Sequence, residues 1–136
     1  MKYILFLNIL LCFNLNAFAQ EKTADENPFE TEIIFSSQDK DNLQFWHYEQ
    51  VLKMKLNEEG RDNYLSLLNY YTYKMSRLGL KKYGYTEAER KMKFDKLVDA
   101  LNADMKDLLS PANYGIHKES FKKITQIVYE RRNWNN

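Results

Sequence analysis

The sequence has little of what a non-helical fold requires. Of its 136 residues only four are glycine, two are proline and one is cysteine. So few glycines and prolines argue against a turn-rich β-sandwich and against a disordered chain. The single cysteine, Cys12, lies in a segment that we expect to be removed. The mature chain would then have no disulfide, no thiolate catalyst and no cysteine-ligated zinc site.

The first 19 residues are typical of a cleaved export signal. Lys2 supplies the positive start, residues 4–15 are largely apolar, and residues 17–19, Ala-Phe-Ala, fit the small-x-small cleavage rule. Nothing after residue 20 is apolar for long enough to span a bilayer. A lipoprotein signal built on Cys12 fits less well, because Leu11 stands where a small residue is needed. We therefore expect an exported protein of the periplasm, with the cell surface as the alternative.

Charge separates along the chain. Residues 20–50 carry eight acidic and two basic side chains, a net charge of −6, whereas residues 51–136 carry 17 basic and 11 acidic ones, a net charge of +6. Two solvated surfaces without a binding role would explain this pattern. So would a basic body that attracts acidic partners and an acidic arm that shields it. We expect a signal peptide (1–19), a flexible acidic leader (20–40), a helical domain (41–132) and a tail (133–136).

From residue 41 onward, apolar residues recur at helical spacing, which predicts four amphipathic helices. The expected N-terminal caps are Asp41 or Asn42, Asn57, Thr86 in a capping box with Glu89, and Ser110 followed by Pro111. The stripes expected to face the core are Phe45, Tyr48, Leu52 and Leu56; Tyr64, Leu68, Tyr71, Met75 and Leu78; Phe94, Val98, Leu101, Met105 and Leu108; and Tyr114, His117, Phe121, Ile124 and Val128.

This spacing also predicts how the helices pack. Successive steps of three and four residues favour helices that lie nearly antiparallel with a slight supercoil. The short connection between the second and third helices predicts an αα-hairpin. Because no pattern of period two follows residue 41, the predicted fold class is all-α, with about four helices, in which the other helices flank the hairpin. Thin hairpins share little core, so we expect the chain to pair as a homodimer.

Residues that could carry catalysis or hold a metal show no recognisable spacing. The two histidines, His47 and His117, belong to no pair at i and i+4. His117 lies on the apolar stripe of the last helix, which predicts a partly buried, hydrogen-bonded histidine. No serine lies in a Gly-x-Ser-x-Gly turn, and there is no glycine-rich phosphate loop. We expect no enzymatic activity, cofactor, metal or small-molecule substrate.

Tyrosines alternate with basic residues near the end of the second helix. Tyr70 and Tyr73 lie off the apolar stripe, so more aromatic surface exists than one hairpin seam can bury. Such residues could bind nucleic acid, but export argues against it. Packing and snorkelling of these side chains without any binding role is the structural alternative. Basic residues around apolar ones also suit transient binding of unfolded proteins. The candidate protein-binding residues are Tyr70, Tyr73, Lys74, Arg77, Lys81 and Lys82.

One short pattern opens two of the predicted helices. It reads Leu56-Asn57-Glu58-Glu59-Gly60 before the second helix and Leu109-Ser110-Pro111-Ala112-Asn113 before the fourth. Over residues 45–132 the chain resembles the Spy/CpxP family of periplasmic stress proteins, whose Leu-Thr-x-x-Gln repeat is such a helix start. Asn57 replaces the threonine of the repeat, and Gly60 and Asn113 replace its glutamine.

The resemblance implies an all-α hairpin that pairs as an antiparallel, cradle-like homodimer. It also implies ATP-independent chaperoning of unfolding envelope proteins, or inhibition of a stress sensor. The alternative is an accessory structural subunit of an envelope complex that docks through its tyrosine face. Some members of the family are linked to metal stress, but this chain lacks a ligand cluster, so a metal role is not carried over.

Overall fold

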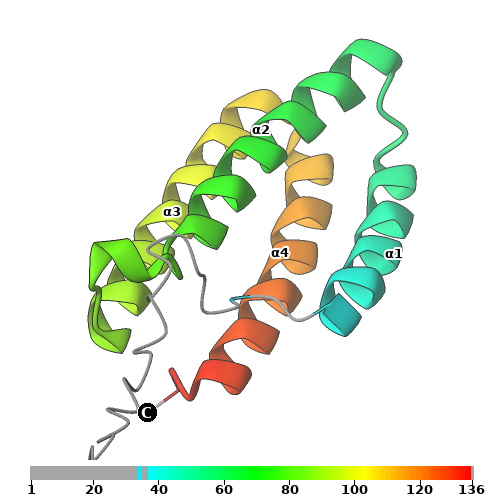
Figure 1. Ribbon diagram of the computed structural model, residues 1–136. Helices are drawn as coiled ribbons and strands as arrows, with labels where there is room; N and C mark the ends of the chain where they lie inside the picture. Colours follow the sequence, from blue (N-terminus) through cyan, green and yellow to red (C-terminus); the bar gives the residue numbers. More distant parts are fainter. Residues whose placement is uncertain (1–33, 35–36, 136) are drawn as a thin grey trace, which may run out of the picture.

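The computed structural model describes Ile34 and residues 37–135, most of which lie in four α-helices (Figure 1). They are α1 (Ser37–Met54), α2 (Glu58–Arg77), α3 (Glu87–Leu108) and α4 (Pro111–Arg132), and the short 3-10 helix η1 (Lys81–Tyr83) lies between α2 and α3. Within these residues there is no β-strand. The predicted all-α fold with four helices is confirmed.

The helices pack in the spatial order α2, α3, α4, α1 (Figure 1). α2 and α3 lie side by side as the predicted antiparallel hairpin, α4 returns along α3, and α1 lies on the other side of α4. Gly84 makes the hairpin connection possible, because its φ of 59° lies in the left-handed region that favours glycine. None of the described helices is both long and apolar enough to cross a bilayer.

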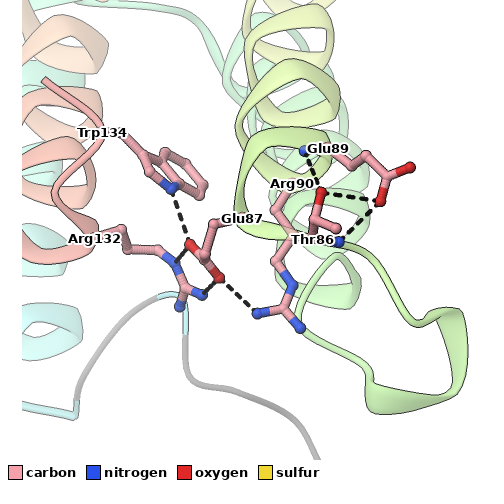
Figure 2. Close-up of polar contacts among 6 residues, drawn as sticks. All are labelled: Thr86, Glu87, Glu89, Arg90, Arg132 and Trp134. Carbon is pink, nitrogen blue, oxygen red and sulfur yellow. Dashed lines mark hydrogen bonds and ion pairs between the residues drawn. The ribbon is translucent and has the colours of Figure 1, made fainter. Parts of the chain in front are cut away.

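Three of the four helices begin at the N-terminal caps that the sequence predicts. Asn57 Oδ1 accepts a hydrogen bond of 2.8 Å from the backbone of Gly60, and Ser110 caps α4. Thr86 and Glu89 form the complete capping box that opens α3 (Figure 2). Each cap satisfies an N–H group that the helix leaves without a partner, which stabilises the start by about 1 kcal/mol.

The start of the first helix differs from the prediction. α1 begins at Ser37 instead of residue 41, so the expected caps Asp41 and Asn42 both lie inside the helix. Residues 1–33 and 35–36, which include the predicted signal and most of the predicted leader, lie outside the described residues.

Three of the four predicted apolar stripes face the core. The stripe residues of α2 to α4 that are buried are Tyr64, Leu68, Tyr71, Met75 and Leu78; Phe94, Leu101 and Met105; and His117, Phe121, Ile124 and Val128. Val98 and Tyr114 are partly buried against this core. Leu108 is 39% exposed, contrary to the prediction, and Leu109 is buried in its place. The reason is that α3 ends at Leu108, so the extended backbone of Leu109 turns that side chain inward.

The stripe predicted for the first helix is wrong at three of its four residues, and the fourth, Leu56, lies beyond the end of α1 and is half-buried. Phe45, Tyr48 and Leu52 are 69%, 61% and 58% exposed. α1 instead buries Val51 and Met54 and turns the ring of His47 inward (half-buried). Steps of four and three residues join these inward residues too, so both faces of α1 satisfy the helical period. The face that contains the histidine turns inward, where its ring meets polar groups on other helices.

The segment expected as a tail, residues 133–136, includes one buried side chain, that of Trp134. The left-handed backbone of Asn133, with a φ of 53°, reverses the chain after α4. The side chain of Trp134 is buried, with its ring centroid 5.6 Å from that of Phe94 and 5.8 Å from that of Tyr129. Trp134 is therefore part of the core, while its neighbours Asn133 and Asn135 are exposed. Ile34 is likewise buried in this core at the other end of the described chain.

Glu87 fastens this tail to the start of α3 (Figure 2). Its carboxylate accepts hydrogen bonds from Trp134 Nε1 at 2.9 Å, Arg132 Nη2 at 2.6 Å and Arg90 Nη1 at 2.7 Å. These donors favour the ionised form, the strongest effect coming from Arg132, and they lower the pKa of Glu87 to about 2. Glu87 therefore joins the C-terminal segment to the α2–α3 hairpin by charge as well as by hydrogen bonds.

Candidate protein-binding surface

Two tyrosines on the outer face of α2 are each covered by a cation one turn further along. The Lys74 ammonium lies 4.2 Å from the Tyr70 ring centroid and also hydrogen-bonds the Tyr70 hydroxyl. The Arg77 guanidinium lies 5.3 Å from the Tyr73 centroid and donates a 3.0 Å hydrogen bond to the Tyr73 hydroxyl. Residues four apart share one side of a helix, so α2 itself sets both pairs. The tyrosines remain 51% and 60% exposed.

The same chemistry continues into η1. Lys81 and Lys82 are exposed there, and the Lys82 ammonium lies 5.1 Å from the ring centroid of Tyr83. A hydrogen bond to Tyr83 is the largest of the effects that raise the pKa of Arg77. Four of the six predicted residues thus lie on one side of α2, and the other two, Lys81 and Lys82, lie on the adjoining η1. We call these six residues the aromatic–basic surface.

Tyr71, which lies between Tyr70 and Tyr73 in the sequence, points toward α3 and is buried. The Tyr71 hydroxyl donates a 2.5 Å hydrogen bond to Asp104 of α3, and this bond is the main cause that raises the pKa of Tyr71 to about 12. The Tyr70 ring meets the Tyr71 ring edge-on, with centroids 5.1 Å apart. Tyr71 therefore holds α2 against α3, while Tyr70 and Tyr73 face solvent.

A second exposed apolar surface lies on α1, where the periodicity predicted core. Phe45, Tyr48 and Leu52 follow one another by three and four residues, so they form one stripe along the helix, which we call the α1 stripe. Adjacent exposed apolar side chains of this size are typical of contact surfaces. The sequence holds a rival stripe of His47, Val51 and Met54 on the same helix, which indicates that either face could be buried but does not decide between them.

Both copies of the resemblance motif act as helix starts. In the first, Asn57 is the cap and Glu58 and Glu59 lie in the first turn. In the second, Ser110 is the cap and Pro111 follows it. The Asn113 backbone donates to Ser110 Oγ at 3.3 Å. Leu56 is half-buried and Leu109 is buried. A Cβ atom on Gly60 would lie 2.9 Å from Asn57 Oδ1, so the family's glutamine there would displace the cap oxygen.

Two surface cavities lie away from the aromatic–basic surface. The larger, of about 620 Å³, is an open depression at the start of α2, where Glu58, Glu59 and Asp62 give it an acidic lining. The smaller, of about 380 Å³, lies between α3 and α4 near Asn102 and Phe121. Neither cavity includes any residue of the aromatic–basic surface. A protein bound to that surface would therefore contact side chains that protrude from it. Over the described part of the chain, no three histidine, aspartate or glutamate side chains gather as a metal site requires.

Comparisons with protein-family models, with curated proteins and with solved structures found no match. The likeness to the Spy/CpxP family therefore rests on the residues of the two motifs. The helix caps that the two motifs form are enough to explain why these residues occur there.

Proposed function

We propose that the protein binds unfolded or partly folded envelope proteins through the aromatic–basic surface, as an ATP-independent chaperone or a stress adaptor in the periplasm. The observation that carries this proposal is the pairing of exposed tyrosines with cations along α2. Tyr70 and Tyr73 stay accessible, although Tyr71 between them shows that α2 can bury a tyrosine.

The physical properties of this surface suit weak and general binding. Tyrosine offers a large contact area while its hydroxyl can remain hydrated. Lysine and arginine around the rings steer acidic segments toward them, and this attraction weakens as salt is added. Such contacts do not require a defined partner shape. They would hold an exposed apolar segment briefly and release it without an energy source.

The α1 stripe is a second place for apolar contact. In the homodimer that we expect, the α1 stripes of the two copies would pack against each other and form the apolar centre of an isologous interface. Dimerisation and client binding would then use different helices, α1 for the one and α2 with η1 for the other.

Aggregation of a chemically denatured client, followed by light scattering with and without the mature protein, tests the chaperone proposal. We expect suppression at a several-fold molar excess. The double variant Tyr70→Ser with Tyr73→Ser should lose most of it, whereas Met92→Ser should retain it. Met92 is a matched control because it is a 49% exposed apolar residue on α3. Absence of suppression by the wild-type protein, or equal suppression by all variants, would remove the proposal.

A second candidate function is that of an accessory structural subunit of an envelope complex. The α1 stripe favours it, because a permanently exposed apolar helix face suits a fixed partner. Purification from the native envelope separates the two candidates. One stoichiometric partner would favour the subunit, and many weakly bound partners would favour the chaperone.

A further inference from the structure

A chain of polar side chains crosses the core and joins all four helices. The hydroxyl of Tyr64 (α2) lies 3.3 Å from Nε2 of His47 (α1) and 3.1 Å from Nδ1 of His117 (α4). His117 Nε2 lies 3.1 Å from Oδ1 of Asn102 (α3), and His47 Nδ1 lies 3.0 Å from Oγ of Ser120 (α4). Tyr64, His117 and Ser120 are almost completely buried. We call these five residues the histidine–tyrosine chain.

With both imidazoles neutral, every hydrogen bond of this chain can form. The amide oxygen of Asn102 only accepts, so His117 carries its proton on Nε2 and offers Nδ1 as an acceptor. The Tyr64 hydroxyl then donates to His117 and accepts from Nε2–H of His47. The remaining ring nitrogen of His47 accepts from the hydroxyl of Ser120. No polar group in the chain is left without a partner.

One added proton leaves this arrangement intact. Placed on Nδ1 of His47, it makes that nitrogen a donor to the oxygen of Ser120, and the other bonds keep their direction. Placed on His117, it requires only that the Tyr64 hydroxyl turn to donate to Nε2 of His47, whose own proton moves to Nδ1. Either way, the chain holds a single positive charge with all its hydrogen bonds formed.

A second added proton breaks the chain. Both imidazolium rings would then donate to the oxygen of Tyr64, and the Tyr64 proton would have no acceptor. Two positive charges would also share one buried site, with ring centroids 5.9 Å and 5.8 Å from that of Tyr64. Burial and the nearby charge of His47 already lower the pKa of His117 to about 4, and burial lowers the pKa of His47.

α1 is the helix whose attachment depends most on the hydrogen bonds of this chain. In residues 44–54, the part of α1 whose side chains the structure describes, the hydrogen bonds to other helices come from His47. The charged groups that α4 presents nearby are mainly cationic. Lys123 lies 4.7 Å from the Trp46 ring centroid of α1, and Lys118 and Glu119 line the cavity beside Asn102. The members that α2 and α3 contribute to the chain are Tyr64 and Asn102.

We propose that the histidine–tyrosine chain is an acid-sensitive latch, which holds α1 against α4 while it carries at most one added proton and releases α1 when it takes a second. Release would uncover Val51 and Met54, next to the α1 stripe that is already exposed. The latch is a property of the fold and does not depend on the proposed chaperone activity.

Hydrogen exchange of the mature protein, read by mass spectrometry, tests this proposal. Samples at about pH 7 and about pH 4 are compared after correction for the intrinsic pH dependence of exchange. We expect the α1 segment to lose protection at least about tenfold at the lower pH, while the segment around Leu101 in α3 keeps it. Protection that is lost equally in both segments, or retained in α1, would overturn the proposal.

Two variants separate the latch from general acid sensitivity. His47→Gln retains a donor and an acceptor but cannot take up a proton, so α1 should keep its protection at about pH 4. Glu119→Gln, the matched control, removes a nearby exposed ionisable group and should open as the wild-type protein does.

If His47→Gln does not fold, the proposal is tested in the wild-type protein by following the NMR resonances of the two histidine rings as the pH is lowered. A latch requires two well-separated protonation steps shared by the two rings. Two independent steps near the ordinary histidine pKa of about 6.5 would contradict it.

Discussion

Trp134→Ala is the substitution that most sharply tests whether the C-terminal segment belongs to the core. Trp134 is buried against Phe94 and Tyr129 and donates to Glu87. Replacing a buried tryptophan by alanine typically costs about 3–5 kcal/mol, through lost burial and the cavity left behind. In a domain of about 100 residues, each kcal/mol lowers Tm by about 4–8 °C. The expected fall in Tm is therefore at least about 12 °C.

Thermal unfolding followed by circular dichroism at a helical wavelength measures this fall. Trp46→Ala is the matched control, because it makes the same chemical change at a half-buried position on α1. We expect the control to lower Tm by less than half as much. A Trp134→Ala protein that melts within about 3 °C of the wild type would refute the assignment of Trp134 to the core.

Three further predictions concern the core, the surface and acid. Leu101→Asp should abolish cooperative unfolding in urea by burying an unpaired charge at a fully buried position, and a normal transition would contradict this. Tyr70→Ala should change the free energy of unfolding by no more than about 0.5 kcal/mol, and a large loss would mean that this face packs inward. Glu87→Gln should lower Tm at neutral pH. Because the pKa of Glu87 falls to about 2, its ionised form stabilises the fold above about pH 4.5 and this benefit disappears as the pH falls toward 2. The Tm difference from wild type should vanish over that range, and a constant difference would contradict the charge effect.

The parts of the fold that the sequence predicts are those decided within a few residues. The caps at Asn57, Thr86 and Ser110 depend on side chains that bond to backbone three residues away. The stripes of α2 to α4 were predictable because each of these helices has one dominant apolar face. The outward position of Tyr70 and Tyr73 follows from the same periodicity.

What the sequence did not predict depends on partners far away along the chain. α1 has two faces of equal periodicity, and the choice between them depends on Tyr64 and Ser120, which bond to His47 from α2 and α4. The local composition around Trp134 is polar, and the side chain is buried because Glu87 and Phe94 of α3 meet it. Neither contact leaves a local pattern that a sequence window can detect.

Photocrosslinking from α2 to a client tests the central claim most directly. A photoreactive phenylalanine analogue at position 73 would be irradiated with a chemically denatured protein of known sequence, and position 92 on α3 would serve as the control site. Binding through the aromatic–basic surface predicts a crosslink from position 73 that weakens as salt is added and a much weaker crosslink from position 92. Equal crosslinking from both positions, or none from position 73, would contradict the account.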